Sequence, residues 1–273
     1  MGPDLVVLTD FSESSRRALA YAAALAQPLQ SRVVLLHLYQ DVLLDPEYVV
    51  IPAGAAIRSQ RETRRALEKM AEELPVPATV DLSVNTLAEA LADAIARYHP
   101  LVLVCGRAAT PDFLDQLLGD QSLPVLRHLH YPLLMVPENA HLPGSPTRVG
   151  LVADGEPFKL RDNALNMQPL WEALGAKYFV LHVETEEQYD RARTAVNSLR
   201  HNHLVKDLPP DSLYTVHHTR PATGILQAAA DTQTELLVLL ARERSLLGGL
   251  FHRSITAQVL QRSPVPVLVL PVI

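Results

Sequence analysis

The sequence predicts an α/β protein made of two doubly wound parallel sheets in tandem, each covered by helices on both faces. Its first support is an internal repeat. Three apolar segments recur in the same order: LVVLTD at 5–10 and VGLVAD at 149–154, LLHLY at 35–39 and VLHVE at 180–184, PLLMVP at 132–137 and PVLVLP at 266–271. The second support is that the segments are continuous apolar runs, which are typical of parallel strands buried on both faces. We expect domains at 1–137 and 148–273, joined by the linker ENAHLPGSPT at 138–147.

Strands and helices alternate along the first half. The run at 5–10 is a buried strand, and Ser12 after it can cap a helix whose apolar residues follow helical spacing. Further strands are expected at 32–39, 78–84, 101–106 and 132–137, and further helices at 58–74, 87–98 and 113–129. This alternation favours a parallel sheet, because parallel strands need crossover connections.

The second half repeats the pattern with two differences. The offset between the copies is 144 or 145 residues for the first two segments and 134 for the last, so about ten residues are missing after the second strand. Its first helix, expected at about 158–174, contains Pro169, which removes a backbone hydrogen bond and should end or kink the helix.

Composition narrows the class of protein. With 273 residues, of which 48% are hydrophobic and 20% charged, the chain can bury two ordinary cores. A net charge of −6 argues against nucleic-acid binding, which needs basic patches. The single cysteine, Cys105, excludes an internal disulfide framework and fits a reducing compartment. The sequence shows neither a signal peptide nor a membrane-spanning run, so we expect a cytoplasmic protein.

Particular residues resemble the universal stress protein family. They are the first strand ending in Asp10 and followed by FSES, the strand containing His37, and the tails VLRHLHYPLLMVP and ITAQVLQRSPVPVLVLP. The resemblance covers nearly the whole chain as a tandem pair. It implies a Rossmann-like sheet of strand order 3-2-1-4-5 in each half, with ligands bound at the carboxyl ends of the strands beside the switch point.

Many members of that family bind ATP, and the resemblance implies where the first half would do so. Asp10 would contact adenine or ribose, although a carboxylate at the end of this strand could instead cap the following helix. The backbone near Leu38 or Tyr39 would contact adenine. The family's phosphate loop has glycine, two residues, glycine, nine residues, glycine, then serine or threonine. In this chain those positions are Gly106, Ala109, Gly119 and Asp120. Two glycines remain to let backbone amides approach phosphate, whereas Asp120 would repel phosphate unless a divalent cation such as Mg²⁺ lay between them.

When the two halves are aligned on their last strands, the motif positions of the second half are Leu240, Glu243, Arg253 and Ser254. All the glycines are lost, and Leu240 would close the crevice, although Asp154 is retained. Arg253 and Ser254 could instead hold a small anion, or Arg253 could be solvated. We expect the second half not to bind ATP.

Other residues allow a functional or a structural interpretation. His201, His203, His217 and His218 could be a metal cluster, but adjacent histidines on a strand point to opposite faces, which favours surface residues. Cys105 would need a nearby cation such as Arg107 to be reactive, and structural burial is the alternative. His37 and His182 occupy equivalent strand positions, which indicates a role in the fold.

Three functions remain compatible with the sequence. The first is a stress-linked binding or regulatory module without enzymatic activity, which binds an adenine nucleotide in the first half. The second is a slow ATPase or nucleotide-transferring enzyme in which Asp120 helps to hold magnesium. The third is a structural protein with both pockets lost.

The crossover at 40–78 and the last strands bear on assembly. In the family the last strands of two domains pair edge to edge, so PLLMVP and PVLVLP could pair within this chain as a pseudo-dimer. That pairing would leave the crossover, with its apolar quartet at 48–51 and its charged helix, free for another contact, including one with a second copy in a homodimer.

Overall fold

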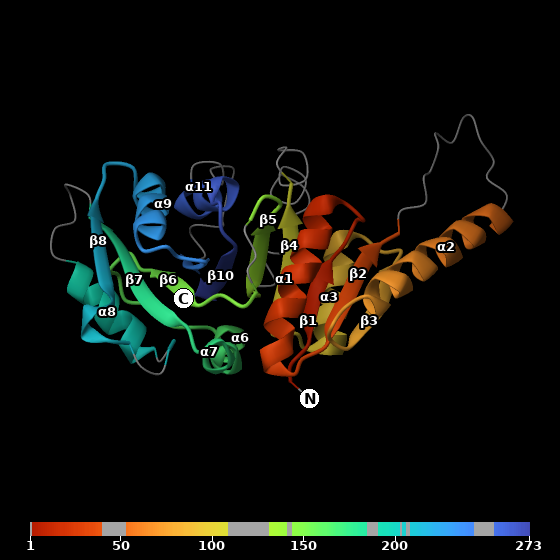
Figure 1. The fold of residues 1–273 in the computed structure, drawn as a ribbon, viewed down its shortest axis with the longest axis horizontal. Coiled ribbons are helices and arrows are strands. Elements are labelled where there is room, and N and C mark those ends of the chain that lie inside the picture. The colour runs from red at the N-terminus through yellow and green to blue at the C-terminus, as the bar shows by residue number, and fades with distance from the viewer. Residues whose placement is uncertain are drawn as a thin grey trace.

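The computed structural model of the chain describes residues 2–39, 53–108, 131–140, 144–184, 191–202, 204–205, 208–242 and 254–273. The helix expected at 113–129 and the apolar quartet at 48–51 lie outside these residues. Figure 1 shows the described elements.

The first half alternates strands with helices as predicted. Its described elements are β1 (Leu5–Leu8), α1 (Glu13–Leu29), β2 (Val33–Leu38), α2 (Ala53–Glu72), β3 (Ala78–Ser83), α3 (Leu87–Tyr98), β4 (Val102–Arg107) and β5 (Leu133–Pro137). The hydroxyl of Ser12 accepts a hydrogen bond from the Ser15 amide at 3.2 Å and thereby caps α1 as expected. Helix α2 begins at Ala53, earlier than the predicted start at residue 58.

The second half contains β6 (Arg148–Val152), α6 (Asp162–Leu165), α7 (Gln168–Leu174), β7 (Lys177–Glu184), α8 (Ala192–His201), a 3₁₀ turn (Pro210–Ser212), β8 (Leu213–His217), α9 (Pro221–Asp231), β9 (Leu236–Arg242), α11 (Ile255–Arg262) and β10 (Val267–Val272). The helix expected at 158–174 is broken into α6 and α7. Pro169 lies in the first turn of α7, where its missing amide costs no helical hydrogen bond. The second half is about ten residues shorter than the first after its second strand. Most of this difference lies in the crossover helix, because α8 has 10 residues and its counterpart α2 has 20.

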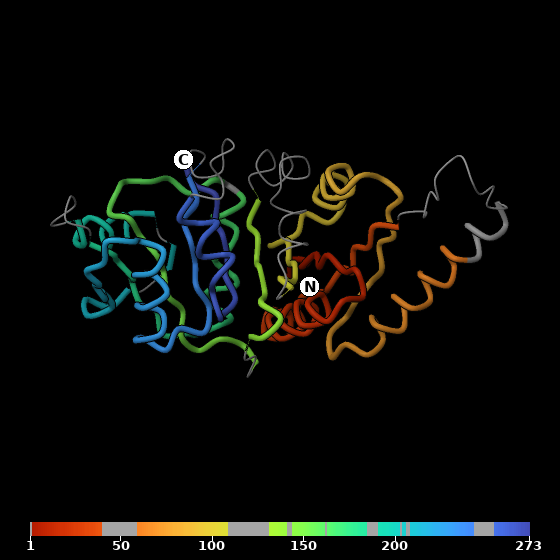
Figure 2. The backbone as a smooth tube through the Cα atoms, turned by 90° about the horizontal axis from the view of Figure 1, so that it is seen from above, coloured from red at the N-terminus to blue at the C-terminus, as the bar shows by residue number. Residues whose placement is uncertain are grey.

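The two sheets are joined edge to edge into one sheet of ten strands, in the order β3-β2-β1-β4-β5-β10-β9-β6-β7-β8. Each half therefore has the order 3-2-1-4-5 with parallel neighbours. At the junction β5 and β10 run antiparallel, with Leu134 opposite Leu268. The pairing of the two last strands within one chain is confirmed, and Figure 2 shows the halves side by side around it.

Helices cover both faces of this sheet. On one face α1, α7 and α8 pack on a core cluster that contains buried residues of both halves. On the other face α3, α9 and α11 pack on a second cluster, which also spans the junction. The chain thus folds around cores shared by the two halves. Among the described helices, none is long and apolar enough to cross a membrane.

Candidate functional site

The candidate site lies where the sheet order reverses, at the carboxyl ends of β1, β2 and β4. Parallel strands of this order open a crevice at that edge, because the connections from the neighbouring strands run to opposite faces. Asp10 follows β1, Leu38 ends β2, and Gly106 is next to the end of β4. The fold therefore brings these three predicted residues to one edge of the sheet. Ala109, Gly119 and Asp120 lie outside the described residues.

Asp10 is an exposed carboxylate whose orientation is fixed by the start of α1. Its Oδ1 accepts hydrogen bonds from the Ser12 amide at 3.0 Å and the Ser12 hydroxyl at 2.5 Å. Partial burial raises the pKa of Asp10, but hydrogen bonds from Ser12 and Ser15 outweigh burial, and the pKa lies below its ordinary value. Within the described ranges no cationic side chain pairs with Asp10. Asp10 is thus an oriented carboxylate acceptor, and among the described residues its hydrogen-bond donors are Ser12 and Ser15.

At the end of β2, the backbone groups of Leu38 and Tyr39 differ in their hydrogen bonding. The Tyr39 amide donates to the carbonyl of Ser83 on β3 at 2.8 Å, so it is already engaged. On the other side of the strand, the Leu36 carbonyl accepts from the Thr9 amide at 3.0 Å. Because peptide groups alternate along a strand, the amide and carbonyl of Leu38 point to the same side as those of Leu36, beyond the end of β1. Leu38 therefore presents a donor and an acceptor to the crevice.

The packing of helix α1 explains why position 106 is a glycine. A Cβ built on Gly106 would lie 2.2 Å from the carbonyl oxygen of Ser14 and 2.8 Å from the amide of Ser15. These are backbone atoms of the first turn of α1, which cannot move without displacing the helix. The absence of a side chain at Gly106 thus lets α1 begin directly over β4, beside Asp10. Sequence reasoning assigned this glycine to phosphate approach and did not foresee the packing role.

In the second half an arginine pairs with the equivalent carboxylate, Asp154. The Arg242 guanidinium, at the end of β9, donates to both carboxylate oxygens of Asp154 at 3.3 Å. It also donates to the carbonyls of Pro157 at 3.0 Å and Glu156 at 3.1 Å. Arg242 therefore bridges the ends of β6 and β9 across the crevice. The arginine is visible in the sequence after the strand, but sequence analysis did not assign it this role; in the first half its counterpart is Ala108.

The two halves also differ at the residue equivalent to Gly106. Gly106 pairs with Val136 on β5, and Leu240 pairs with Leu270 on β10, which confirms the register used to align the copies. Leu240 fits because the segment after Asp154 is not helical until α6 begins at Asp162, so no counterpart of the first turn of α1 crosses β9. Instead Leu240 packs against the core cluster.

The paired histidines serve the fold, as their equivalent positions predict. His37 Nδ1 lies 2.7 Å from the Thr9 carbonyl oxygen, and His182 Nδ1 lies 2.8 Å from that of Ala153. Because a carbonyl only accepts, Nδ1 of each ring carries the proton and ties the second strand to the end of the first. Of the other histidines, His217 contacts Glu184 at 3.1 Å, and the described residues contain no group that could hold a metal ion; His203 lies outside them.

Cys105 and Arg107 are structural. The side chain of Cys105 is fully buried, and burial raises the pKa of its thiol to about 12. The Arg107 guanidinium donates to the carbonyls of Gln261 and Ser263 at the carboxyl end of α11. A cation there complements the helix dipole and links the two halves.

A labelling experiment tests the burial of Cys105. Because the thiolate is the reactive species, iodoacetamide at about pH 8 should modify the native protein at least about 100-fold more slowly than the urea-unfolded protein. Mass spectrometry of quenched samples gives both rates. Similar rates in the two states would show that the thiol is accessible and would contradict the buried assignment.

Comparisons with known proteins agree with this architecture. The model of the universal stress protein family matches residues 3–137 and again residues 160–271. Universal stress protein A of Escherichia coli K12 is 28% identical over 140 residues, which cover 49% of this chain and 92% of that protein. The crystal structure of a universal stress protein from Archaeoglobus fulgidus DSM 4304 superposes with a TM-score of 0.64 at 18% identity, covering 97% of this chain and 95% of that chain.

A domain of a cation transporter shares the fold as well. The cytoplasmic domain of a prokaryotic cation chloride cotransporter superposes with a TM-score of 0.54 at 12% identity, covering 99% of this chain and 95% of that chain. Similarity at this identity shows a shared fold alone. The two matches of the family model, the repeated strand order and the conserved register between the copies together assign the chain: it belongs to the universal stress protein family and carries two copies of the family's domain in tandem.

Proposed function

We propose that this tandem universal stress protein is a regulatory binding module that takes one adenine nucleotide, in the crevice of its first half. The observation that carries the proposal is the contrast between two equivalent carboxylates. Asp10 is oriented by Ser12 and has no cationic partner among the described residues, whereas Asp154 is paired with Arg242. The second half has thus filled its own crevice, and the first half has kept an acceptor for an external donor.

The chemistry at this edge suits a purine nucleoside. An ionised carboxylate only accepts hydrogen bonds, and the exocyclic amine of adenine and the ribose hydroxyls are donors that Asp10 Oδ2 can bind. The backbone of Leu38 offers a donor and an acceptor side by side, which complements the edge of an adenine ring. In this proposal Ala109 and Gly119 allow the loop backbone to approach the phosphates, and Asp120 contacts them through Mg²⁺, which supplies the charge neutralisation that a carboxylate there requires.

Thermal unfolding with ATP and Mg²⁺ tests the proposal. A ligand that binds only the folded state at about 100 times its Kd stabilises it by about 2.7 kcal/mol, so ATP should raise the melting temperature of the wild-type protein. Asp10→Asn keeps an oxygen for Ser12 but removes the charge, and a lost hydrogen bond to a charged group should weaken ATP binding about 10- to 100-fold. Isothermal titration calorimetry measures the affinities directly.

Asp154→Asn is the matched control, because it makes the same change at the equivalent carboxylate. It should leave the ATP affinity within about twofold, since Asp154 lies in the closed crevice. The assignment of the site fails if Asp10→Asn binds ATP like wild type, or if only Asp154→Asn loses binding. Phosphate release measured in the same samples separates a binding module from a slow ATPase.

A further inference from the structure

Arg107, at the end of β4 in the first half, holds the carboxyl end of helix α11 in the second half. Its guanidinium donates to the carbonyl of Gln261, in the last turn of α11, and to the carbonyl of Ser263 at 2.6 Å. Ser263 is fully buried, so the contact ends inside the junction of the halves. A helix leaves its last four carbonyls without partners of their own. Arg107 supplies a donor to one of them from the other half of the chain.

The charge of Arg107 has no carboxylate beside it. Burial lowers the pKa of the guanidinium, and no anionic side chain of the described residues offsets this effect. Its Nε–H is buried and finds no acceptor in the same part of the chain. Because buried charges are usually paired, this one depends on the carbonyls and on the negative end of the α11 dipole. The contact is therefore sensitive to where β4 ends.

The end of β4 also belongs to the candidate site of the first half. Arg107 directly follows Gly106, which packs against the first turn of α1 beside Asp10. Strands β5 and β10 run antiparallel, so the start of β10, which follows the end of α11, lies at the carboxyl edge of the first half's strands. Arg107 thus lies between the crevice of the first half and the carboxyl end of α11.

This link is made by one half and not by the other. Leu240 is the counterpart of Gly106, so the counterpart of Arg107 is Ala241, whose methyl side chain carries no donor. A structural need of the junction alone would be expected in both halves, because the fold repeats. The cation is instead supplied by the half whose carboxylate, Asp10, has no cationic partner among the described residues.

We propose that Arg107 couples the two halves, so that a nucleotide bound beside Asp10 stabilises the last turn of α11. This coupling rests on the nucleotide site proposed above. A ligand in the crevice restrains the end of β4 and with it the guanidinium of Arg107. The carbonyls of α11 then stay bonded for a larger fraction of the time, and the last turn of the helix opens less often. Occupancy of the first half is thereby transmitted to the second.

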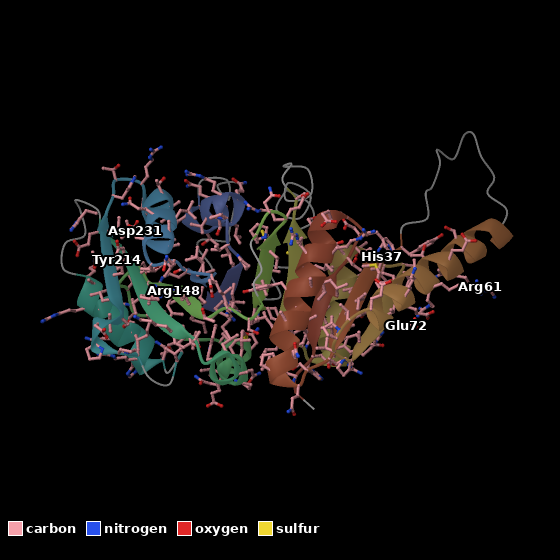
Figure 3. All side chains as sticks on the ribbon, in the orientation of Figure 1. His37, Arg61, Glu72, Arg148, Tyr214 and Asp231 are labelled. Carbon is pink, nitrogen blue, oxygen red and sulfur yellow. The ribbon has the colours of Figure 1, made fainter. Side chains whose placement is uncertain are left out.

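Hydrogen exchange followed by mass spectrometry tests the coupling, with ATP and Mg²⁺ at a concentration that calorimetry shows to be saturating. In wild type, ATP should slow exchange in residues 255–263 at least about fivefold more than in β7 and β8, at the low end of typical coupling factors. Strands β7 and β8 are the reference for any general stabilisation by the ligand, because they lie on the side of the second half away from the first. Figure 3 labels Tyr214 of β8 on that side. Slower exchange in residues 5–15, around Asp10, reports that the nucleotide is bound.

Arg107→Met removes the guanidinium and keeps a long apolar side chain. When this variant is saturated with ATP, exchange in residues 5–15 should still be slowed, whereas the extra slowing in residues 255–263 should disappear. Arg262→Met is the matched control, because Arg262 is an exposed arginine in the same last turn of α11. It makes the same change of charge and should keep the wild-type response.

The outcomes separate the coupling from the nucleotide site. Slowing in residues 5–15 of wild type without extra slowing in residues 255–263 overturns the coupling and leaves the site in place, and this result needs no variant. Extra slowing that persists in Arg107→Met also overturns the coupling. If ATP neither binds in calorimetry nor slows exchange in residues 5–15, the proposed function fails, and the coupling fails with it.

Discussion

Replacing Gly106 with alanine is expected to destabilise the folded chain by about 3 kcal/mol, at the upper end of the usual cost of overpacking, even when no nucleotide is present. The added Cβ would lie 2.2 Å from the carbonyl oxygen and 2.3 Å from the carbonyl carbon of Ser14. Relief of this clash requires α1 to move away from β4, and α1 contributes much of the shared core. Urea unfolding followed by circular dichroism measures the loss.

The equivalent position in the second half provides the control. Leu240 is only partly buried, so Leu240→Ala removes fewer contacts and should cost less than a typical buried Leu→Ala change, which is about 2–5 kcal/mol. If Gly106→Ala has wild-type stability but loses ATP binding, the glycine serves the ligand rather than the helix, and the packing explanation is wrong.

Shortening Leu134 to alanine, in β5 of the first half, is expected to destabilise the second half as well. Leu134 is only 2% exposed and lies opposite Leu268 of β10, in the core cluster that both halves share. A buried Leu→Ala change costs about 2–5 kcal/mol. Because the cluster is continuous, we expect the halves to unfold together. The only tryptophan of the chain, Trp171 in α7, reports on the unfolding of the second half. The unfolding midpoint measured by Trp171 fluorescence should therefore be lower in Leu134→Ala than in wild type.

Val84→Ala is the control for this experiment, because Val84 is 67% exposed and its truncation should change stability by less than about 0.5 kcal/mol. A Trp171 transition that stays at its wild-type midpoint in Leu134→Ala, while circular dichroism shows a separate earlier transition, would mean that the halves unfold independently. That result would contradict a shared core.

The repeat made most of the fold predictable. Continuous apolar runs indicated the buried parallel strands, and their repetition indicated two copies of one domain. The strand order 3-2-1-4-5 within each copy was implied by the resemblance to the family. The pairing of PLLMVP with PVLVLP followed from the resemblance to a family in which last strands pair. An interruption of the helix near Pro169 was correctly predicted, because proline is disfavoured in the interior of a helix but tolerated in its first turn, where Pro169 lies in α7. The start of α2 at Ala53 was missed, since small residues before the charged stretch carry little periodic signal.

The candidate site was less predictable, because its properties depend on contacts between distant segments. Asp10 and Asp154 end equivalent strands and appear equally available in the sequence. Their difference arises from Arg242, which reaches Asp154 only because β9 lies beside β6 in the folded sheet. The close approach of Ser14 to Gly106 likewise depends on how α1 crosses β4. A glycine in a family motif suggested ligand contact, and no local signal distinguished that role from packing.

The turn after the first strand illustrates how the copies diverged. Phe11 and Gly155 occupy equivalent positions and both have positive φ, 66° and 78°. The turn therefore requires the left-handed backbone conformation at this position in each half. Glycine adopts this conformation without strain, and a Cβ at Gly155 would lie 2.6 Å from that of Arg191. Phe11 adopts the same conformation although it has a side chain. Its ring packs edge-on against the ring of His37, with 4.9 Å between the two ring centroids. The same turn is thus packed closely against Arg191 in the second half, and in the first half it places an aromatic ring beside His37.

Native mass spectrometry of the full chain with ATP and Mg²⁺ tests the central claim most directly, namely that one crevice is open and its duplicate is filled by Arg242. We predict one nucleotide site per chain in wild type and in Asp154→Asn, and, at an ATP concentration close to the wild-type Kd, an occupancy at least about fivefold lower in Asp10→Asn. Two nucleotides per chain, or a wild-type occupancy in Asp10→Asn, would contradict it.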